Sequence, residues 1–197
     1  MSEITQKRVK LFLTLAFLIS WSVALVIALT GGLVNSPEVK SGSGVTLAVV
    51  LIASIYMWGP ALANILTRWI TKESWGNALL KPQIKVAWLY WLAGWFGPGI
   101  LTILGTILFF VILPQFYDSN FTLLKSQLEA AGIQQSLSNP FGYILGQAIS
   151  AMLIAPLLNF SATFGEEFGW RGYLLPKLSE MGRRKALLLS SIIWGVW

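Results

Sequence analysis

Cysteine and histidine are both absent from the 197-residue sequence, and only 11% of its residues are charged. Without cysteine the chain forms no disulfide and offers no thiolate to a metal ion. Without histidine it also lacks the commonest metal ligand of proteins. Hydrophobic residues make up 55% of the chain, and the mean hydropathy is +0.68, far outside the range of ordinary soluble domains. The composition therefore predicts an integral membrane protein.

Five apolar runs follow one another along the chain: Leu11–Leu29, Val45–Leu66, Val86–Leu113, Phe141–Leu175 and Ala186–Trp197. A helix needs about 20 apolar residues to cross a hydrocarbon core roughly 30 Å thick. The first four runs are long enough, whereas the fifth has only 12 residues. We predict an all-α polytopic transmembrane helix bundle with four complete spans and a truncated fifth. We expect residues 1–197 to form a single membrane-embedded domain, the C-terminally truncated part of a larger helical domain.

Proline and glycine mark three places where these helices should bend. They are the Trp58–Pro60 segment in the second run, the Gly94–Gly99 segment in the third, and Pro156 in the fourth. A proline inside a helix removes one backbone hydrogen bond and clashes with the preceding turn. The fourth run would be about 52 Å long as one straight helix, which exceeds the core thickness, so a break or an overhang is expected there.

The longest loop, residues 114–140, contains a short segment with helical periodicity. Leu124, Leu128 and Ala131 recur at spacings of four and three residues, which predicts a short amphipathic helix. We expect this helix to lie on the outer surface of the membrane.

The formal net charge of +6 follows from the distribution of lysine and arginine among the loops. These residues gather before the first apolar run and after the second and fourth, whereas the two remaining loops hold only Lys40 and Lys125. By the positive-inside rule this asymmetry places the N-terminus in the cytoplasm. Because the excess is explained by topology and forms no patch with interleaved aromatics, we predict no nucleic-acid partner and assign the basic residues no ligand.

Two adjacent acids and an arginine interrupt the fourth run, in the segment SATFGEEFGWRGYLLPKL. Glu166 lies about 16 Å along a helix from the basic boundary at Lys177, which puts it near the middle of the membrane. An ionisable group at that depth is costly and is a functional-site hypothesis by default. Glu167 and Arg171 are four residues apart, in the favourable order for an ion pair within one helix.

Glu166 is the acid that this pairing leaves over. On a helix it points about 100° away from Glu167, and Gly165 and Gly169 beside it would let another helix, a water molecule or a backbone come close. One interpretation is structural: Glu167 and Arg171 form a strut, and Glu166 lies in a hydrated groove near the cytoplasm. A strut needs only one acid, however. A carboxylate in a dry, apolar site is a suitable general base, which is the second interpretation.

A transporter or proton relay also uses acids inside the membrane. Glu166 with Asn159, Ser161 and Thr163 would line such a path, but the inverted repeats typical of transporters are not found in the sequence. A non-catalytic membrane protein that confers immunity to a bacteriocin is a further alternative, and it would need the helices without the acid.

The segment EEFGWR resembles the Glu-Glu-x-x-x-Arg motif of the CAAX-protease and bacteriocin-processing family (CPBP, Abi type) of intramembrane endopeptidases. The RGYLLP continuation and the WGVW tail occur at that family's spacing, so the resemblance covers about the last fifty residues. It implies that Glu166 activates the attacking water and that Glu167 and Arg171 shape the site. It also implies a peptide or protein substrate presented at the lipid bilayer, in a multi-pass protein of a prokaryotic plasma membrane.

The sequence departs from the family pattern in one respect, because the histidines that the family carries on later helices are absent. The family is called a metalloprotease family, and a metal-independent glutamate mechanism is also argued for it. Catalytic zinc usually takes three protein ligands. Glu166 alone among these residues would be a candidate ligand, so a divalent metal such as zinc is not supported by the ligands present. We expect the 197-residue chain to be an incomplete and inactive part of the endopeptidase.

Overall fold

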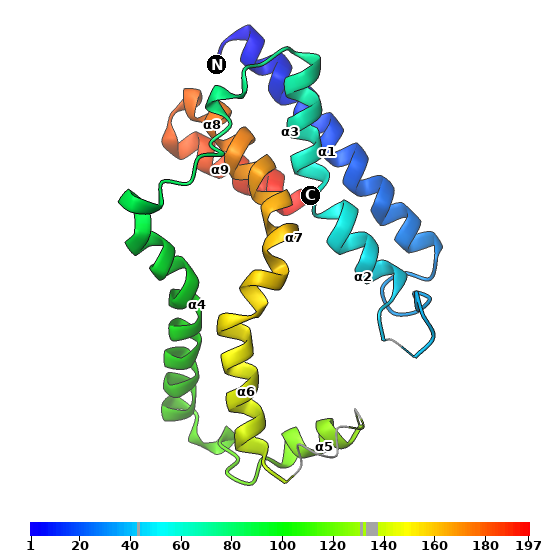
Figure 1. The fold of residues 1–197 in the computed structure, drawn as a ribbon, viewed down its shortest axis with the longest axis vertical. Coiled ribbons are helices and arrows are strands. Elements are labelled where there is room, and N and C mark those ends of the chain that lie inside the picture. Colours follow the sequence, from blue (N-terminus) through cyan, green and yellow to red (C-terminus); the bar gives the residue numbers. More distant parts are fainter. Residues whose placement is uncertain (43, 131, 133–137) are drawn as a thin grey trace. The chain divides into compact units, whose positions relative to one another are not determined.

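The computed structural model describes residues 1–42, 44–130, 132 and 138–197. Within these residues the chain is helical, and its only β-type pairing is an isolated bridge between Glu38 and Thr46. The predicted all-α class is confirmed. The chain divides into two compact units, one made of Met1–Lys81 with Phe160–Trp197 and the other of Pro82–Asn159, and Figure 1 shows the course of their helices. The single domain expected from the sequence stays a prediction.

The first unit is built from two long helical segments and a helical hairpin. Its elements are α1 (Glu3–Leu29), α2 (Leu47–Leu51), a π-helical turn (Ile52–Tyr56), α3 (Gly59–Ile70), most of α7 (Ala155–Gly169), a second π-helical turn (Trp170–Leu174), α8 (Leu175–Leu178) and α9 (Arg183–Val196). Ser2 caps α1 by accepting from the Thr5 amide at 3.1 Å. Gly182 has φ of +93° between α8 and α9, a conformation that glycine adopts without strain, and the chain reverses there.

One face of α1 is buried over its whole length. The residues on this face recur every three or four positions: Thr5, Val9, Phe12, Ala16, Ser20, Val23 and Ile27. This spacing forms a single stripe on a helix. The stripe packs along α3 and on the segment that follows α7, where Phe12 meets Trp170 edge to face with ring centroids 5.6 Å apart. This core fixes the helices that surround Glu166.

The predicted kink at Trp58–Pro60 is confirmed, because the second apolar run changes there from a π-helical turn into α3. Pro60 has no amide hydrogen for the Tyr56 carbonyl, four residues earlier. The hydroxyl of Ser20 donates to that carbonyl instead, at 3.1 Å. Gly59 lies so close to Ser20 that any side chain at position 59 would collide with it. The bend therefore depends on a neighbouring helix for its hydrogen bond.

The second unit contains α4 (Ile84–Ile112), α5 (Thr122–Ala130), α6 (Pro140–Leu153) and the start of α7. α6 ends just before Ile154, so the predicted break at Pro156 is confirmed. Pro156 cannot donate to the Met152 carbonyl, and the indole of Trp95 in α4 donates to it at 2.9 Å. In contrast, α4 continues without interruption through Pro98, so the third run is a single helix.

The short helix predicted in the long loop is present as α5, and its Leu128 is buried. Ala131, the third residue of the predicted apolar face, lies outside the described residues. The position of α5 on the outer surface remains a prediction.

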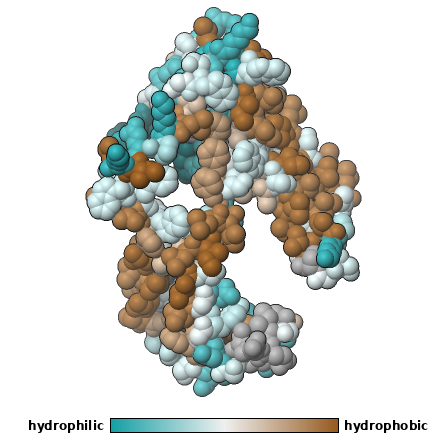
Figure 2. Space-filling model, viewed as in Figure 1, coloured by the Kyte–Doolittle hydropathy of each residue, from teal (hydrophilic) through white to brown (hydrophobic). Residues whose placement is uncertain are grey.

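Three helical segments are long and apolar enough to cross a membrane: Glu3–Leu29, Leu47–Ile70 and Ile84–Ile112. A fourth is obtained if Pro140–Leu153 and Ala155–Met181 count as one bent span. The number of spans among the described residues is therefore three to four by length and composition. Figure 2 shows hydrophobic residues over most of the visible surface of both units, with hydrophilic residues around the N-terminal end of α1. This surface agrees with an integral membrane protein.

Candidate functional site

Glu166 lies near the C-terminal end of α7, between two glycines that bring another backbone close. A side chain at Gly165 would place its Cβ 2.7 Å from the Met57 carbonyl oxygen, and one at Gly169 would collide with Pro60. The predicted role of these glycines, to admit a close neighbour, is confirmed. The neighbour is the kink before α3. Glu166 is thus held where two bent helices touch.

Two aromatic residues from other elements surround Glu166. The indole of Trp194, in α9, lies beside the Glu166 carboxylate. The phenol of Tyr56, at the end of the first π-helical turn, lies within electrostatic range of the same carboxylate. The side chain of Glu166 is partly buried. Two aromatic residues that carry polar groups, from two other elements, therefore lie around this acid.

The predicted ion pair between Glu167 and Arg171 is present. Both side chains are partly exposed, with 34% of the Glu167 side chain and 54% of the Arg171 side chain accessible. The Arg171 guanidinium lies over the ring of Trp194, 4.6 Å from its centroid. Trp194 thus contacts both Glu166 and Arg171. The sequence gives no signal for these contacts of Trp194, because it does not show that the α8–α9 hairpin returns this residue to α7.

The two π-helical turns meet at Trp197. Its ring lies 4.7 Å from Tyr56 and 5.5 Å from Trp170, centroid to centroid. Tyr56 also donates a hydrogen bond to the Trp197 carbonyl. Such turns are found frequently at functional sites, because they displace side chains from ordinary helical positions. Here they place three aromatic rings beside the Glu166 helix.

A buried ionic network includes Tyr173 and Lys177, which follow Glu166 by about two to three helical turns. Glu73, whose side chain is 3% exposed, pairs with Lys177 and lies 3.4 Å from Arg8 and 3.9 Å from Arg68. Tyr173 donates to the same carboxylate at 3.0 Å. Burial alone would raise the pKa of Glu73. The hydrogen bonds from Lys177 and Tyr173 and the charges of Lys177 and Arg8 outweigh burial and lower the pKa.

One of the basic residues that follow the second apolar run makes structural contacts inside the protein. Arg68 lies in α3 and is only 2% exposed, and its Nε donates to Asn64 Oδ1 at 2.8 Å. The Asn64 amide in turn donates to the Phe168 carbonyl at 2.9 Å. The signal that would have identified this pair is the i, i+4 spacing of two polar residues at the end of the second apolar run.

The residues present do not fit a zinc site. The described residues contain no group of three acidic, histidine or cysteine side chains that would hold a metal ion. The two carboxylates of the motif have different neighbours, because Glu167 pairs with Arg171 and Glu166 lies beside Trp194. No step of the chemistry below is therefore assigned to a metal.

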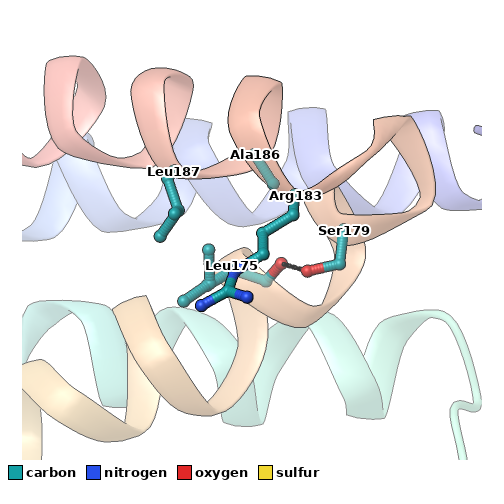
Figure 3. Close-up of a pocket in the computed structure, with 5 residues that line it drawn as sticks. All are labelled: Leu175, Ser179, Arg183, Ala186 and Leu187. Carbon is teal, nitrogen blue, oxygen red and sulfur yellow. Dashed lines mark hydrogen bonds between the residues drawn. The ribbon is translucent and has the colours of Figure 1, made fainter.

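An open groove of about 510 Å³ lies between α8 and α9, lined by Leu175, Ser179, Arg183, Ala186 and Leu187. Figure 3 shows Arg183 reaching into it beside Ser179, which donates to the Leu175 carbonyl at 2.8 Å. The lining contains no acid and no paired nucleophile. This groove does not provide an alternative catalytic centre.

Comparison with the curated proteins and with the solved structures found no match. Residues 142–197, which include Glu166, Glu167 and Arg171, match the model of the family described as type II CAAX prenyl endopeptidase Rce1-like. The matched residues are less than a third of the chain, and they include the segment that carries the resemblance to the CAAX-processing endopeptidase family.

Proposed function

We propose that the protein is an intramembrane endopeptidase of the CAAX-processing type, in which Glu166 activates the water that hydrolyses a peptide bond. One observation carries the proposal. Of the two adjacent acids, Glu167 forms an ion pair with Arg171, whereas Glu166 has no ion pair among the described residues and lies beside the Trp194 indole. A carboxylate that has no ion-pair partner is available to accept a proton.

The reaction follows from this arrangement. In this reaction the Trp194 indole, which lies beside Glu166, orients one carboxylate oxygen, and the other oxygen accepts a hydrogen bond from the attacking water. Glu166 takes a proton from that water as its oxygen attacks the scissile carbonyl carbon, and a tetrahedral oxyanion forms. Glu166 then returns the proton to the leaving nitrogen as the C–N bond breaks. Arg171, whose charge acts on Glu166, stabilises the negative charge that develops.

The proposal also includes the substrate and the membrane location of the enzyme. The substrate is a peptide or protein presented at the lipid bilayer, and the enzyme is a multi-pass protein of a prokaryotic plasma membrane with its N-terminus in the cytoplasm. The bent α6–α7 segment acts as the fourth span, and α9 belongs to a fifth. Glu167 and Arg171 shape the site through their pair and through the contact of Arg171 with Trp194.

No observation favours a proton relay through the same acid. Such a relay would need polar side chains that continue from Glu166 along α7. The Asn159 amide donates to the Ala155 carbonyl of its own helix at 2.8 Å. This donor is therefore already used within the helix. The polar group beside Glu166 is the Trp194 indole, which is a hydrogen-bond donor only and does not ionise near neutral pH.

The test uses the protein encoded by the complete reading frame that contains these residues, purified and placed in lipid vesicles. A farnesylated peptide with a CAAX C-terminus serves as the probe, and mass spectrometry detects release of its last three residues. Cleavage that requires Glu166 supports the proposal. Absence of cleavage together with a Glu166-dependent proton flux into dye-loaded vesicles would overturn it in favour of the relay.

A further inference from the structure

A chain of buried polar contacts runs from the loop after α3 to the helix that carries Glu166. It passes from Glu73 to Arg68, from Arg68 to Asn64, and from Asn64 to the backbone carbonyl of Phe168. Asn64 is fully buried and Arg68 is 2% exposed. Phe168 lies two residues after Glu166, directly before the end of α7.

The orientation of the Asn64 amide is fixed by its neighbours. Arg68 has only donors, so the Asn64 atom that faces its Nε at 2.8 Å is the carbonyl oxygen. The NH₂ group must then face Phe168. Arg68 is itself held, because its terminal nitrogen donates to the Ser74 carbonyl at 2.5 Å and to Asn77 Oδ1 at 2.7 Å. The donor aimed at the Phe168 carbonyl is thus rigid.

The other contacts between α7 and the start of α3 are apolar. Gly165 and Gly169 lie against the backbone of Met57, Trp58 and Pro60, and Phe164 and Phe168 pack with Trp58 and Ala61. Glycines allow close approach, and apolar packing has no donor–acceptor direction. A hydrogen bond adds such a direction, and with it a defined rotation of α7 about its axis. A buried hydrogen bond from a polar side chain is a known means of fixing register between helices.

We propose that Asn64, oriented by Arg68, is a positioning residue for Glu166. Its hydrogen bond to the Phe168 carbonyl sets the rotation of α7 about its axis and its position along that axis relative to α3. It thereby holds the Glu166 carboxylate beside the Trp194 indole. The inference rests on the proposed function, because Glu166 is the catalytic group that Asn64 would position. Asn64 itself touches no reacting atom.

The experiment compares three variants of the protein encoded by the complete reading frame. Asn64→Leu removes the donor and the acceptor at similar size. Asn64→Asp keeps the acceptor for Arg68 and removes the donor to Phe168. Thr67→Val is the matched control, because Thr67 is fully buried on the same helix and its hydroxyl has no hydrogen-bond partner among the described residues.

Two readouts are taken. The first is kcat and KM for the farnesylated CAAX peptide, and the second is the distance distribution between nitroxide labels at Leu62→Cys and Ser161→Cys, measured by pulsed EPR in this cysteine-free sequence. Both Asn64 variants should lower kcat about tenfold, as loss of one hydrogen bond worth about 1.4 kcal/mol would, with KM unchanged. Both should also broaden the distance distribution, whereas Thr67→Val should change neither readout.

The distance measurement keeps this inference separate from the proposed function, because it needs no activity. If the unmodified protein cleaves no peptide, the proposed function fails, and the distance distribution still decides whether Asn64 fixes α7. A distribution as narrow in the Asn64 variants as in the unmodified protein would overturn the positioning role. So would a broadened distribution with kcat unchanged. If Asn64→Leu does not fold, Asn64→Asp supplies both readouts.

Discussion

At the scale of residues, the adjacent acids Glu166 and Glu167 have different neighbours, and only those of Glu167 were predictable from the sequence. The i, i+4 spacing predicted the Glu167–Arg171 pair, which the structure contains. The partner of Glu166 was not predictable, because Trp194 is 28 positions away and reaches it only through the turn at Gly182. Local spacing determines contacts within a helix, whereas contacts between helices depend on where the chain reverses.

The Trp194 indole beside Glu166 gives a direct prediction. Trp194→Phe keeps an aromatic ring for Arg171 and removes the indole donor, so the Glu166 carboxylate loses its fixed orientation. We expect kcat to fall about tenfold, as for a hydrogen bond worth about 1.4 kcal/mol, with abundance unchanged. Trp197→Phe is the matched control, because the Trp197 indole nitrogen has no hydrogen-bond partner among the described residues. Equal losses in both variants would show that ring size, not the donor, is what matters.

The buried carboxylate of Glu73 predicts a pH dependence of stability. Its pKa in the folded protein lies below the ordinary value of 4.5, so its stabilising effect is complete above about pH 4.5 and is lost as the pH falls through the folded value. Glu73→Gln leaves the surrounding cations without their shared carboxylate and should cost about 3–5 kcal/mol at pH 7. Thermal unfolding in detergent between pH 7 and pH 3 should show a steep decline for the unmodified protein and a flatter curve for the variant. Parallel curves would contradict this role of Glu73.

At the scale of elements, the positions of the bends were predictable and their hydrogen-bond partners were not. Proline at positions 60 and 156 marked two breaks, because a missing amide hydrogen is a local property of the sequence. The donors that satisfy the freed carbonyls, Ser20 and Trp95, come from other helices. Pro98 shows the limit of the rule, since α4 continues through it.

The close approach of α7 to the start of α3 predicts that one glycine tolerates no side chain. Gly169→Ala places a methyl group against the backbone of Pro60, where it cannot be accommodated by a rotamer change. We expect a loss of about 1–3 kcal/mol, as for other overpacked contacts, measured as a lower midpoint of thermal unfolding in detergent. Gly195→Ala is the control, because nothing lies within 4 Å of the added methyl group, and it should leave the midpoint unchanged or raise it. A similar response of both variants would rule out a close α3–α7 contact.

At the scale of the whole molecule, the long apolar runs gave the helical class and three of the spans without reference to the structure. The fourth run is the exception, because its helix is broken at Ile154 and counts as a span only when both parts are taken together. The fifth run forms α9, which is shorter than a span. The hydropathy of a sequence shows how many consecutive apolar residues it contains. It does not show whether the helix that they form is straight.

The orientation in the membrane is a prediction at the same scale. The lysine and arginine distribution places the N-terminus and the loop around Lys81 in the cytoplasm, and the loop around Gln127 outside. Single cysteines introduced at these two positions are the only thiols of this sequence. A membrane-impermeant thiol reagent added to intact cells should label position 127 and not position 81. The opposite labelling pattern would reverse the orientation.

The most direct test of the central claim compares Glu166→Gln with Glu167→Gln in the protein encoded by the complete reading frame. Each change removes one negative charge and keeps the side-chain volume, and the two positions differ only in their partners. We predict that Glu166→Gln lowers kcat for the farnesylated CAAX peptide about 10²–10⁴-fold, the usual contribution of a general base, with unchanged abundance in the membrane. Glu167→Gln should lower abundance, because it leaves Arg171 without its carboxylate, while the remaining molecules keep measurable cleavage. Cleavage by Glu166→Gln at the rate of the unmodified protein would contradict the account.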